Sequence, residues 1–485
     1  MDDEVVMPLT KNFRDYKTGF PSNVATSGEY ALNQSSPDGA ILDGRFNPKY
    51  PVETSAPPIE LYHPAFAQFA ALIRDPTFQV PDDDDILSNT AALIRSCSQI
   101  ETYEGPGNTN TCLILGRILH LPLDQFENDD RTATDCMALY ETPLDSVAAA
   151  CVIAEIKGEL GSTGADPSVQ ASFSFARFYC QPQRDPITDH SNCPTFILGI
   201  AGPWLVIMGG ILTTRPIIQR LSDYMWLGNS RVLDEDQVRR VARNLYALRR
   251  ATNALEEYWD SFVRPCHVKG CEHPRFFPSF DSFTDIHTHT HETVKFAYVK
   301  ALEEGPSCVT FLAKKLLADN NLDSGDGDDR SSHIVIKFVR RYNKEAHVMM
   351  SQRGFAPKLL GYRPLGEENP GYGDLVLLAM EYVKGETLSD RYWGDVIPAQ
   401  VRQGVKEAIQ VLNDAGYIFA DLRRPNLIFR ECDGKVQLID FDWVCRVGEG
   451  MRYPFHLSYD HRTRSGARDN DVITLEHQET MLEEL

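Results

Sequence analysis

The stretch "GYIFADLRRPNLIF", residues 416–429, places charged and amide side chains between two apolar runs. Asp421 and Asn426 lie five positions apart in a segment that is otherwise fit for burial. A second polar interruption follows in "LIDFDWV", residues 438–444, where Asp440 comes directly after an apolar run. Burying a carboxylate costs free energy unless it is paired or binds a cation. The two stretches therefore predict a site that holds something charged.

The composition indicates a globular chain with more than one domain. At 485 residues the chain is longer than one hydrophobic core usually serves, so two or three domains are expected. Hydrophobic residues make up 42% and charged residues 24% of the sequence. The formal net charge of −21 argues against a general nucleic-acid coat protein, although a local basic groove is compatible with it.

The cysteines and the N-terminus predict an intracellular protein, cytoplasmic or nuclear. The eleven cysteines follow no repeated spacing, and the opening "MDDEVVMPLTKNFRDYK" lacks the apolar core of a secretory signal. The uncharged stretch "FILGIAGPWLVIMGGIL", residues 196–212, is short for a membrane span and is interrupted by Gly202-Pro203 and Gly209-Gly210. We expect two buried strands joined by a turn there, and no membrane partner.

The hydrophobic pattern divides the chain into four parts. Residues 1–58 are rich in Ser, Pro, Asn and Asp without periodicity, which predicts a flexible leader. Mixed helix and strand patterns follow, and a long amphipathic stretch at 234–262 closes a first α/β domain at 59–262. The Pro- and His-rich residues 263–289 are expected to form a linker, and residues 290–485 a second domain of mixed α and β structure.

The second domain carries residue types that phosphoryl transfer from ATP requires. That reaction needs a carboxylate that orients the acceptor, two side chains that hold metal, and a cation on the phosphates. Lys337 ends the strand-like "HIVIK", Glu345 lies on the next helix, Asp421 and Asn426 share one loop, and Asp440 follows a strand. Each residue alone is explained by a helix cap or a turn, but independent caps have no reason to follow this order.

These motifs resemble the protein-kinase-like superfamily over roughly residues 290–485. "VIK" is similar to V-A-I-K, "FADLRRPN" to H-R-D-L-x-x-x-N, and "DFD" stands where D-F-G is usual. The resemblance implies a compact bilobal domain, here with a shortened C-lobe. It also implies ATP and Mg²⁺ as cofactors, and transfer to a Ser or Thr hydroxyl of a protein substrate.

The resemblance implies roles for individual residues on the nucleotide side. Lys337 would hold the α- and β-phosphates, and Glu345 would pair with it, although another acid could be the partner because Glu345 follows Lys337 by only eight residues. "LLAMEYVKGETL" looks like the hinge, so that the backbone from Glu381 to Val383 would meet the adenine.

On the acceptor side, Asp421 would act as the base. Arg423 stands where many kinases have a lysine that neutralises phosphate. Asn426 and Asp440 would be the Mg²⁺ ligands, since amide and carboxylate oxygens suit this hard cation.

Several departures from the kinase pattern keep a second interpretation open. Phe419 replaces the usual histidine, and Asp442 replaces the glycine of D-F-G. No glycine-rich phosphate loop precedes Lys337, and no A-P-E segment follows. An active kinase and an inert pseudokinase that serves as a binding platform are both compatible with these residues.

A second group of residues lies in the first domain. Glu155 and Lys157 flank Ile156 in a strand-like run, so both would point to one face of a sheet. The pair resembles the E-x-K half of the PD-(D/E)xK nuclease fold. This implies a divalent metal between Asp135 and Glu155, with Lys157 positioning the attacking water, Gln170 matching a glutamine of some such nucleases, and DNA as a partner. A surface salt bridge on a strand is the alternative.

The two resemblances together are similar to crinkler-type effectors, in which a restriction-nuclease-like module is joined to a fungal-type kinase module. Membership of that class would imply action inside cells, often in the nucleus.

Overall fold

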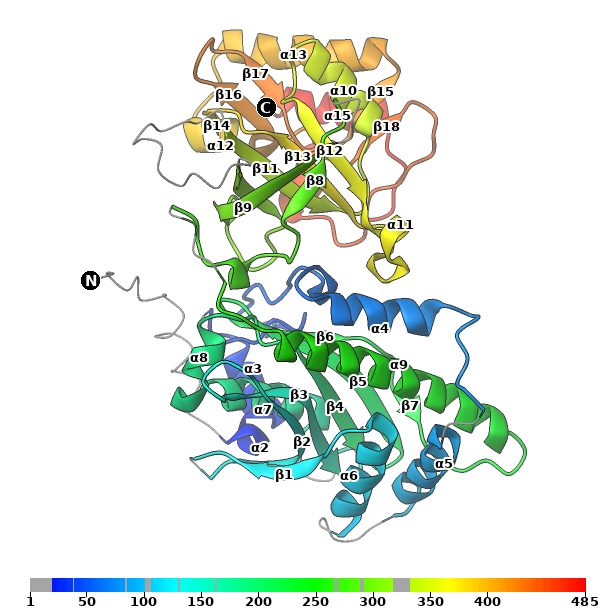
Figure 1. The fold of residues 1–485 in the computed structure, drawn as a ribbon. Helices are drawn as coiled ribbons and strands as arrows, with labels where there is room; N and C mark the ends of the chain where they lie inside the picture. Colours follow the sequence, from blue (N-terminus) through cyan, green and yellow to red (C-terminus); the bar gives the residue numbers. More distant parts are fainter. Residues whose placement is uncertain are drawn as a thin grey trace. The chain divides into compact units, whose positions relative to one another are not determined.

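The computed structural model describes residues 20–37, 39–82, 85–100, 106–129, 131–161, 164–265, 268, 270–287, 292–316 and 332–485 (Figure 1). The chain forms two compact units with mixed α and β structure. Unit 1 comprises Met1–Phe280, Glu304–Cys308 and Asn369–Gly373, and unit 2 comprises Asp281–Glu303, Val309–Glu368 and Asp374–Leu485.

Unit 1 is built on a sheet of the order β1-β2-β3-β4-β5-β6, with β7 paired to β5. Its strands are β1 Asp124–Glu127, β2 Ala133–Glu141, β3 Ala148–Lys157, β4 Thr195–Ala201, β5 Trp204–Leu212, β6 Pro216–Arg220 and β7 Met225–Trp226. Only β3 and β4 pair in parallel among these strands. A parallel pair needs a crossover connection, and helix α7 supplies it by packing on both strands.

The helices of unit 1 cover this sheet. They are α2 Pro21–Val24, α3 Ser27–Asn33, α4 Pro64–Arg74, α5 Ile86–Cys97, α6 Pro106–Leu119, α7 Pro167–Tyr179, α8 Asp185–Thr188 and α9 Asp234–Asp260, with short 3₁₀ turns η2 Ile59–Leu61, η3 Pro182–Arg184, η4 Pro274–Phe276 and η6 Pro370–Tyr372. The long amphipathic stretch thus forms α9, as predicted, and it packs against α4 and α5.

The apolar stretch at 196–212 forms two buried antiparallel strands, β4 and β5, which confirms the prediction made for it. Gly209 is required there for close packing, because a Cβ atom would come within 2.4 Å of the Ile59 side chain and 2.7 Å of Phe66. Within the described residues, no helix is both long enough and apolar enough to cross a bilayer.

The prediction of a flexible leader at 1–58 is wrong for the part that the structure describes. Residues 1–19 and 38 lie outside the described residues, but the following segment forms α2 and α3. Tyr30 and Ile41 are buried in one cluster with Val169 and Phe173 of α7. Scattered apolar residues, too few to show a periodicity, are enough to dock this segment onto a helix that is itself almost wholly buried.

Unit 2 begins with an antiparallel sheet of the order β12-β13-β11-β10-β9-β8. These strands are β8 Ser282–Thr284, β9 Thr293–Ala301, β10 Thr310–Lys315, β11 His333–Val339, β12 Leu359–Pro364 and β13 Val376–Glu381. Helix α10, Lys344–Gln352, follows β11, and the short helix α11, Leu365–Glu368, follows β12.

The rest of unit 2 is mainly helical. Its elements are β14 Gly385–Thr387, α12 Leu388–Arg391, α13 Ala399–Asp414, β15 Tyr417–Phe419, η7 Arg424–Asn426, β16 Leu427–Arg430, β17 Val436–Leu438, β18 Val444–Arg446, α14 Tyr459–Ser465 and α15 Leu475–Glu483. Its core joins the apolar face of α13 to Phe419, Leu427, Leu438 and Phe441, which flank the two polar stretches. The apolar runs therefore anchor the polar loops.

The predicted linker at 263–289 is not a separate segment. Its first part, up to Phe280, belongs to unit 1 and contains η4, whereas β8 joins the sheet of unit 2. The predicted domain at 59–262 lies entirely within unit 1. The structure also links Cys112 on α6 to Cys136 on β2 by a disulfide, a pairing that the cysteine spacing did not predict.

Candidate functional site

The loop between β15 and β16 closes on the carboxylate of Asp421. Nε and Nη2 of Arg423 both donate to this carboxylate, the latter at 2.8 Å. Nδ2 of Asn426 donates to Asp421 Oδ2 at 2.8 Å and to the Asp421 carbonyl at 3.0 Å. Such charge-assisted bonds, in a loop where Asp421 is only 7% exposed, fix the carboxylate in one orientation. They also leave Asn426 Oδ1 for another partner.

His461, on α14, supports the same loop and was missed by the sequence analysis. Its Nε2 lies 3.0 Å from the carbonyl of Ala420 and 3.8 Å from Asp421 Oδ1. Burial lowers the pKa of His461, so the ring is neutral at pH 7 and donates to the carbonyl. No spacing rule connects a histidine forty positions downstream to this loop.

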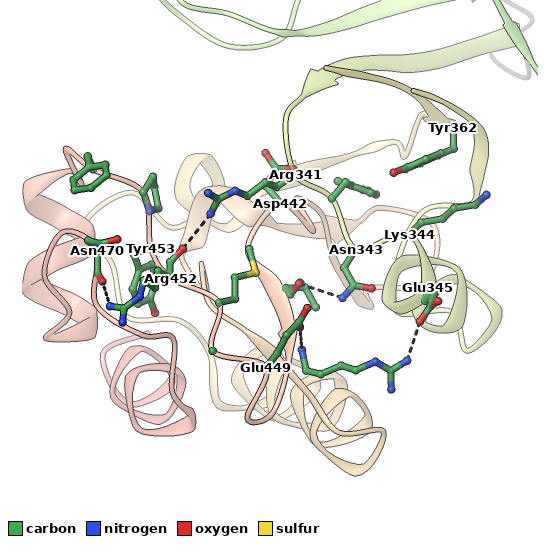
Figure 2. A pocket seen from close by; sticks show the side chains of 17 residues that line it. Arg341, Asn343, Lys344, Glu345, Tyr362, Asp442, Glu449, Arg452, Tyr453 and Asn470 are labelled. Carbon is green, nitrogen blue, oxygen red and sulfur yellow. Dashed lines mark hydrogen bonds and ion pairs between the residues drawn. The ribbon is translucent and has the colours of Figure 1, made fainter. Parts of the chain in front are cut away.

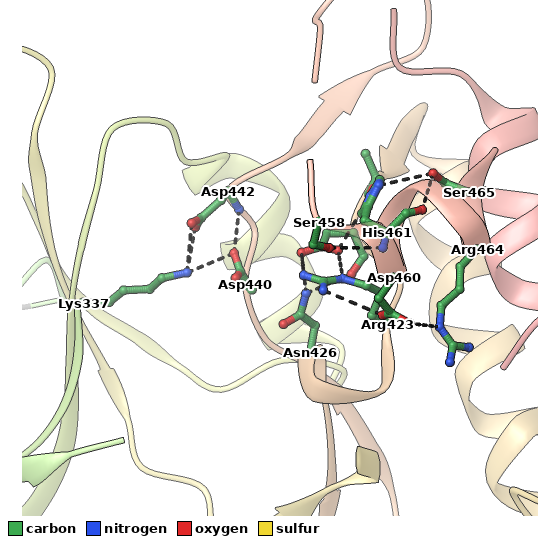
Figure 3. A network of polar contacts seen from close by, with 12 residues as sticks. Lys337, Arg423, Asn426, Asp440, Asp442, Ser458, Asp460, His461, Arg464 and Ser465 are labelled. Carbon is green, nitrogen blue, oxygen red and sulfur yellow. Dashed lines mark hydrogen bonds and ion pairs between the residues drawn. The ribbon is translucent and has the colours of Figure 1, made fainter. Parts of the chain in front are cut away.

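The second polar stretch surrounds Lys337, which projects from β11 (Figure 3). Its Nζ lies 3.0 Å from Asp440 Oδ1 and 3.0 Å from each carboxylate oxygen of Asp442. We call Lys337, Asp440 and Asp442 the lysine cluster.

Burial by itself would lower the pKa of Lys337, but the two carboxylates raise it above its usual value. Burial likewise acts to raise the pKa of Asp440, and the charge of Lys337 reverses this, so that Asp440 is ionised. Asp442 has its pKa raised well above the usual value by burial and by Asp440. Lys337 therefore keeps Asp440 ionised, but its charge does not offset the effects that raise the pKa of Asp442.

The backbone at Asp440 is held in an unusual conformation. Its φ of 71° lies in the left-handed region that residues with a side chain rarely adopt. The amide of Asp442 donates to Asp440 Oδ1 at 3.2 Å, which closes a tight turn around the carboxylate. Phe441 between them is held by His347 of α10, whose ring stacks on it with centroids 4.6 Å apart. Strain of this kind is typical of sites where side-chain direction matters.

The predicted pairing of Lys337 with Glu345 is wrong. The Glu345 carboxylate is 74% exposed and accepts from Arg446 Nη2 at 2.8 Å and from the Tyr417 hydroxyl at 3.2 Å. Helix α10 begins at Lys344, so Glu345 lies in its first turn, and the inward positions are taken by Ala346, His347 and Met350. Asp442 occupies the place beside Lys337 instead.

Glu381 ends β13, and the chain from there to Val383 borders a cavity of about 430 Å³. The other side of this cavity is formed by Arg430, Glu431, Cys432 and Gln437, around the turn between β16 and β17. The structure thus places the two predicted hinge residues at a cavity wall.

Unit 1 brings together the four predicted residues of the first domain. Glu155 is on β3 and Asp135 on the neighbouring β2, and Gln170 of α7 donates to Glu155 Oε2 at 2.6 Å. The charge of Lys157 acts on Glu155. We call Asp135 and Glu155 the acid pair. Since Glu155 is only 1% exposed, the alternative of a surface salt bridge is wrong for this residue.

Two further side chains hold the acid pair in place and were missed by the sequence analysis. Ser174 of α7 donates to Glu155 Oε1 at 2.6 Å. Asn108 of α6 donates to Asp135 Oδ1 at 3.3 Å and to the Ile156 carbonyl at 3.2 Å. The amide of Ile156 donates to Asp135 Oδ2 at 2.8 Å. The sequence signal for Ser174 was its own position, one helical turn after Gln170.

Burial and the neighbouring charge of Asp135 raise the pKa of Glu155 to about 8. Ionising both carboxylates of such a pair costs free energy unless a cation is bound. Among the described residues, no group of three or more His, Cys, Asp and Glu side chains could hold a metal ion. The acid pair supplies two carboxylates side by side, and each of their oxygens accepts a hydrogen bond from the protein.

No protein-family model and no curated protein matches this chain. Among solved structures, the chain is similar to the kinase PK-1 of Cydia pomonella granulovirus, with 18% identity and a TM-score of 0.27. The similarity covers 39% of this chain and 65% of that kinase. At this level of similarity, function is inferred from the side chains of the chain itself.

Proposed function

We propose that unit 2 is an ATP-dependent phosphotransferase of the protein-kinase type, acting on Ser or Thr hydroxyls of a protein. One observation carries this proposal: side chains from three separate stretches converge, with Lys337 beside Asp440 (Figure 3) and with Asn426 donating to Asp421. Burial alone would lower the pKa of Arg423, but the hydrogen bond and charge of Asp421, with the charges of Asp460 and Asp440, raise it above its usual value. The action of Asp440 connects the loop electrostatically to the lysine cluster.

The donor set fits a magnesium nucleotide. Asp440, kept ionised by Lys337, and Asn426 Oδ1 would hold Mg²⁺, which neutralises phosphate charge when it is bound. Lys337 would contact the phosphates while Asp442 holds its side chain in place. Asp421 would orient the acceptor hydroxyl and take up its proton, while Arg423 supplies positive charge beside it. The backbone from Glu381 to Val383 would bind the adenine.

Transfer of the γ-phosphate of labelled ATP to the protein itself and to a generic protein substrate tests this proposal. We expect Asp421→Asn and Asp440→Ala to abolish transfer. The matched control is Asp414→Asn, because Asp414 is exposed at the end of α13 and accepts only from Gln410 among the hydrogen bonds of the described residues. Transfer that survives both active-site substitutions would refute the proposal. ATP binding without transfer would make unit 2 a pseudokinase, the alternative that Phe419 and Asp442 leave open.

A second candidate function belongs to unit 1: metal-dependent cleavage of a phosphodiester, with DNA as the substrate. The observation that favours it is the buried acid pair, which needs a cation to ionise fully, with Lys157 close enough to act on Glu155. Asp135 and Glu155 would bind the metal, Lys157 would position the attacking water, and Gln170 would orient Glu155. A chain with both activities would be akin to the crinkler-type effectors and would act inside cells.

Plasmid nicking with Mg²⁺ or Mn²⁺ tests the second function. We expect nicking to be lost in Lys157→Ala and retained in Asp421→Asn, which assigns it to unit 1. Nicking that persists in Lys157→Ala would refute this site. The two assays use different substrates, so that failure of one leaves the other interpretable.

A further inference from the structure

Unit 2 contains a pocket of about 860 Å³ whose wall shares Asp442 with the lysine cluster but includes neither Asp421 nor Asp440 (Figure 2). The first turn of α10, strand β18 and the loop from Glu449 to Phe455 form its walls. Its volume lies in the range of sites that bind small molecules or the side chains of a peptide.

The pocket carries cations without ionic partners. Among the described residues, no carboxylate lies within ion-pair distance of Arg341, Lys344 or Arg452. Arg341 Nη1 donates to the Arg452 carbonyl at 3.2 Å, and Arg452 Nη1 donates to the Asn470 carbonyl at 2.8 Å. Lys344 Nζ lies 4.9 Å from the centroid of the Tyr362 ring.

Two of the three acids that line the pocket are paired with cations. Glu345 is paired with Arg446, and Asp442 with Lys337. The carboxylate of Glu449 accepts from the Arg446 amide at 2.8 Å. Among the described residues, the three cations without an ion pair thus outnumber the one such acid, Glu449, so that an anion in the pocket meets an excess of positive charge.

A further feature points to the kind of ligand. Phe455 at the rim is 68% exposed and offers an apolar surface beside the cations. Two guanidinium groups and an ammonium suit a phosphate dianion better than a single carboxylate, and the pocket is far larger than a free phosphate.

We propose that this pocket binds the phosphorylated Ser or Thr side chain of a protein segment, with the flanking residues packed on Phe455. Binding of this kind does not depend on the phosphotransferase or on the acid pair of unit 1. It would give unit 2 a means to select partners that are already phosphorylated.

The test uses the full chain without ATP. A phosphoserine peptide in an alanine and leucine background, its unphosphorylated twin and inorganic phosphate are titrated by calorimetry. We expect the phosphopeptide to bind roughly tenfold or more tighter than either of the others, because charge-assisted bonds and apolar contacts act together. Equal affinity for phosphate alone would overturn the assignment to a protein segment, and equal affinity for the unphosphorylated twin would overturn the phosphate assignment.

Substitutions place the binding in the pocket. The double variant Arg341→Gln/Arg452→Gln should lose the preference for the phosphopeptide, and Lys344→Gln, a surface change that spares the backbone contacts, should weaken it. The control is Arg402→Gln, since Arg402 also donates to a backbone carbonyl, that of Glu483, but lies outside the pocket. Unchanged binding in Lys344→Gln and in a folded double variant would refute the proposal.

Discussion

In unit 2, Lys337 lies 3.0 Å from two carboxylates, whereas in unit 1 the carboxylates of Asp135 and Glu155 act on each other as like charges. The first arrangement keeps Asp440 ionised without a metal. In the second, the pKa of Glu155 rises to about 8, so that the side chain holds a proton at pH 7. In both sites one acid has a raised pKa, Asp442 in unit 2 and Glu155 in unit 1, and the difference is that a lysine at ion-pair distance also keeps the second acid of unit 2, Asp440, ionised.

Lys337→Met should break this comparison with the largest effect, because it removes the cation that keeps Asp440 ionised beside Asp442. We expect transfer of the γ-phosphate to fall at least roughly 10³-fold, since a cation on the phosphates is lost. The free energy of unfolding should fall by about 3–5 kcal/mol at pH 7, the usual cost of leaving a buried charge unpaired. Calorimetric unfolding and the labelled-ATP assay measure the two effects.

The double variant Lys337→Met/Asp442→Asn separates stability from activity. It removes one of the two acids together with the lysine, so the free energy of unfolding should recover in part while transfer stays lost. A single variant Lys337→Met that is as stable as the wild type would contradict the view that the lysine compensates buried charge.

Glu155→Gln should be more stable than the wild type at high pH, whereas Lys337→Met should be less stable than the wild type. The folded pKa of Glu155 is about 8 and the ordinary value is 4.5. Between these values the folded protein holds a proton that the unfolded chain has released, so stability is full below about pH 4.5 and is lost as the pH rises toward 8. We expect the wild type, without metal, to lose about 4 kcal/mol relative to Glu155→Gln between pH 5 and pH 8.5.

Denaturant titrations of both proteins at the two pH values measure this difference. The variant is a fair reference, because Gln170 Oε1 has no hydrogen-bond partner among the described residues and can accept from a new amide after the Gln170 side chain flips. A difference that is the same at pH 5 and at pH 8.5 would mean that Glu155 does not hold a proton.

Asp442→Asn sharpens the comparison within unit 2, since it keeps Lys337 beside a single carboxylate. We expect roughly 10²-fold slower transfer, because Asp442 positions Lys337. Glu345→Gln is the matched substitution and should change transfer by no more than about twofold, because that carboxylate pairs with Arg446 at the surface. A larger loss of kcat/KM in Glu345→Gln than in Asp442→Asn would restore Glu345 as the partner of Lys337.

The parts of this molecule that sequence reasoning could predict are those fixed by short spacing. The loop from Asp421 to Asn426 has too few residues to separate its ends, and alternation along β3 places Glu155 and Lys157 on one face. The apolar run at 196–212 could form only buried strands once its glycines were considered. Polar residues between apolar runs thus located both candidate sites.

The parts that could not be predicted depend on how a helix is rotated about its axis, or on contacts between residues far apart in the sequence. The pairing of Lys337 depended on which side of α10 faces inward, and a start at Lys344 turns Glu345 outward. Asn108 reaches Asp135 from a helix with no fixed spacing to it. The segment at 20–58 docks on α7 through a few residues, such as Tyr30, that leave no periodic signal.

The smallest predicted effect concerns Ser174, whose hydroxyl donates to Glu155 at 2.6 Å and so favours the ionised carboxylate. Ser174→Ala should raise the pKa of Glu155 further and weaken Mn²⁺ binding at pH 7 by about tenfold, or about 1.4 kcal/mol. Ser172→Ala is the matched control, because Ser172 is buried on the same helix but donates to the Ser168 carbonyl at 2.7 Å. Titration calorimetry with Mn²⁺ should leave the control within about twofold of the wild type. Equal losses in both variants would show that α7 merely packs against β3, and that Ser174 has no part in charging the acid pair.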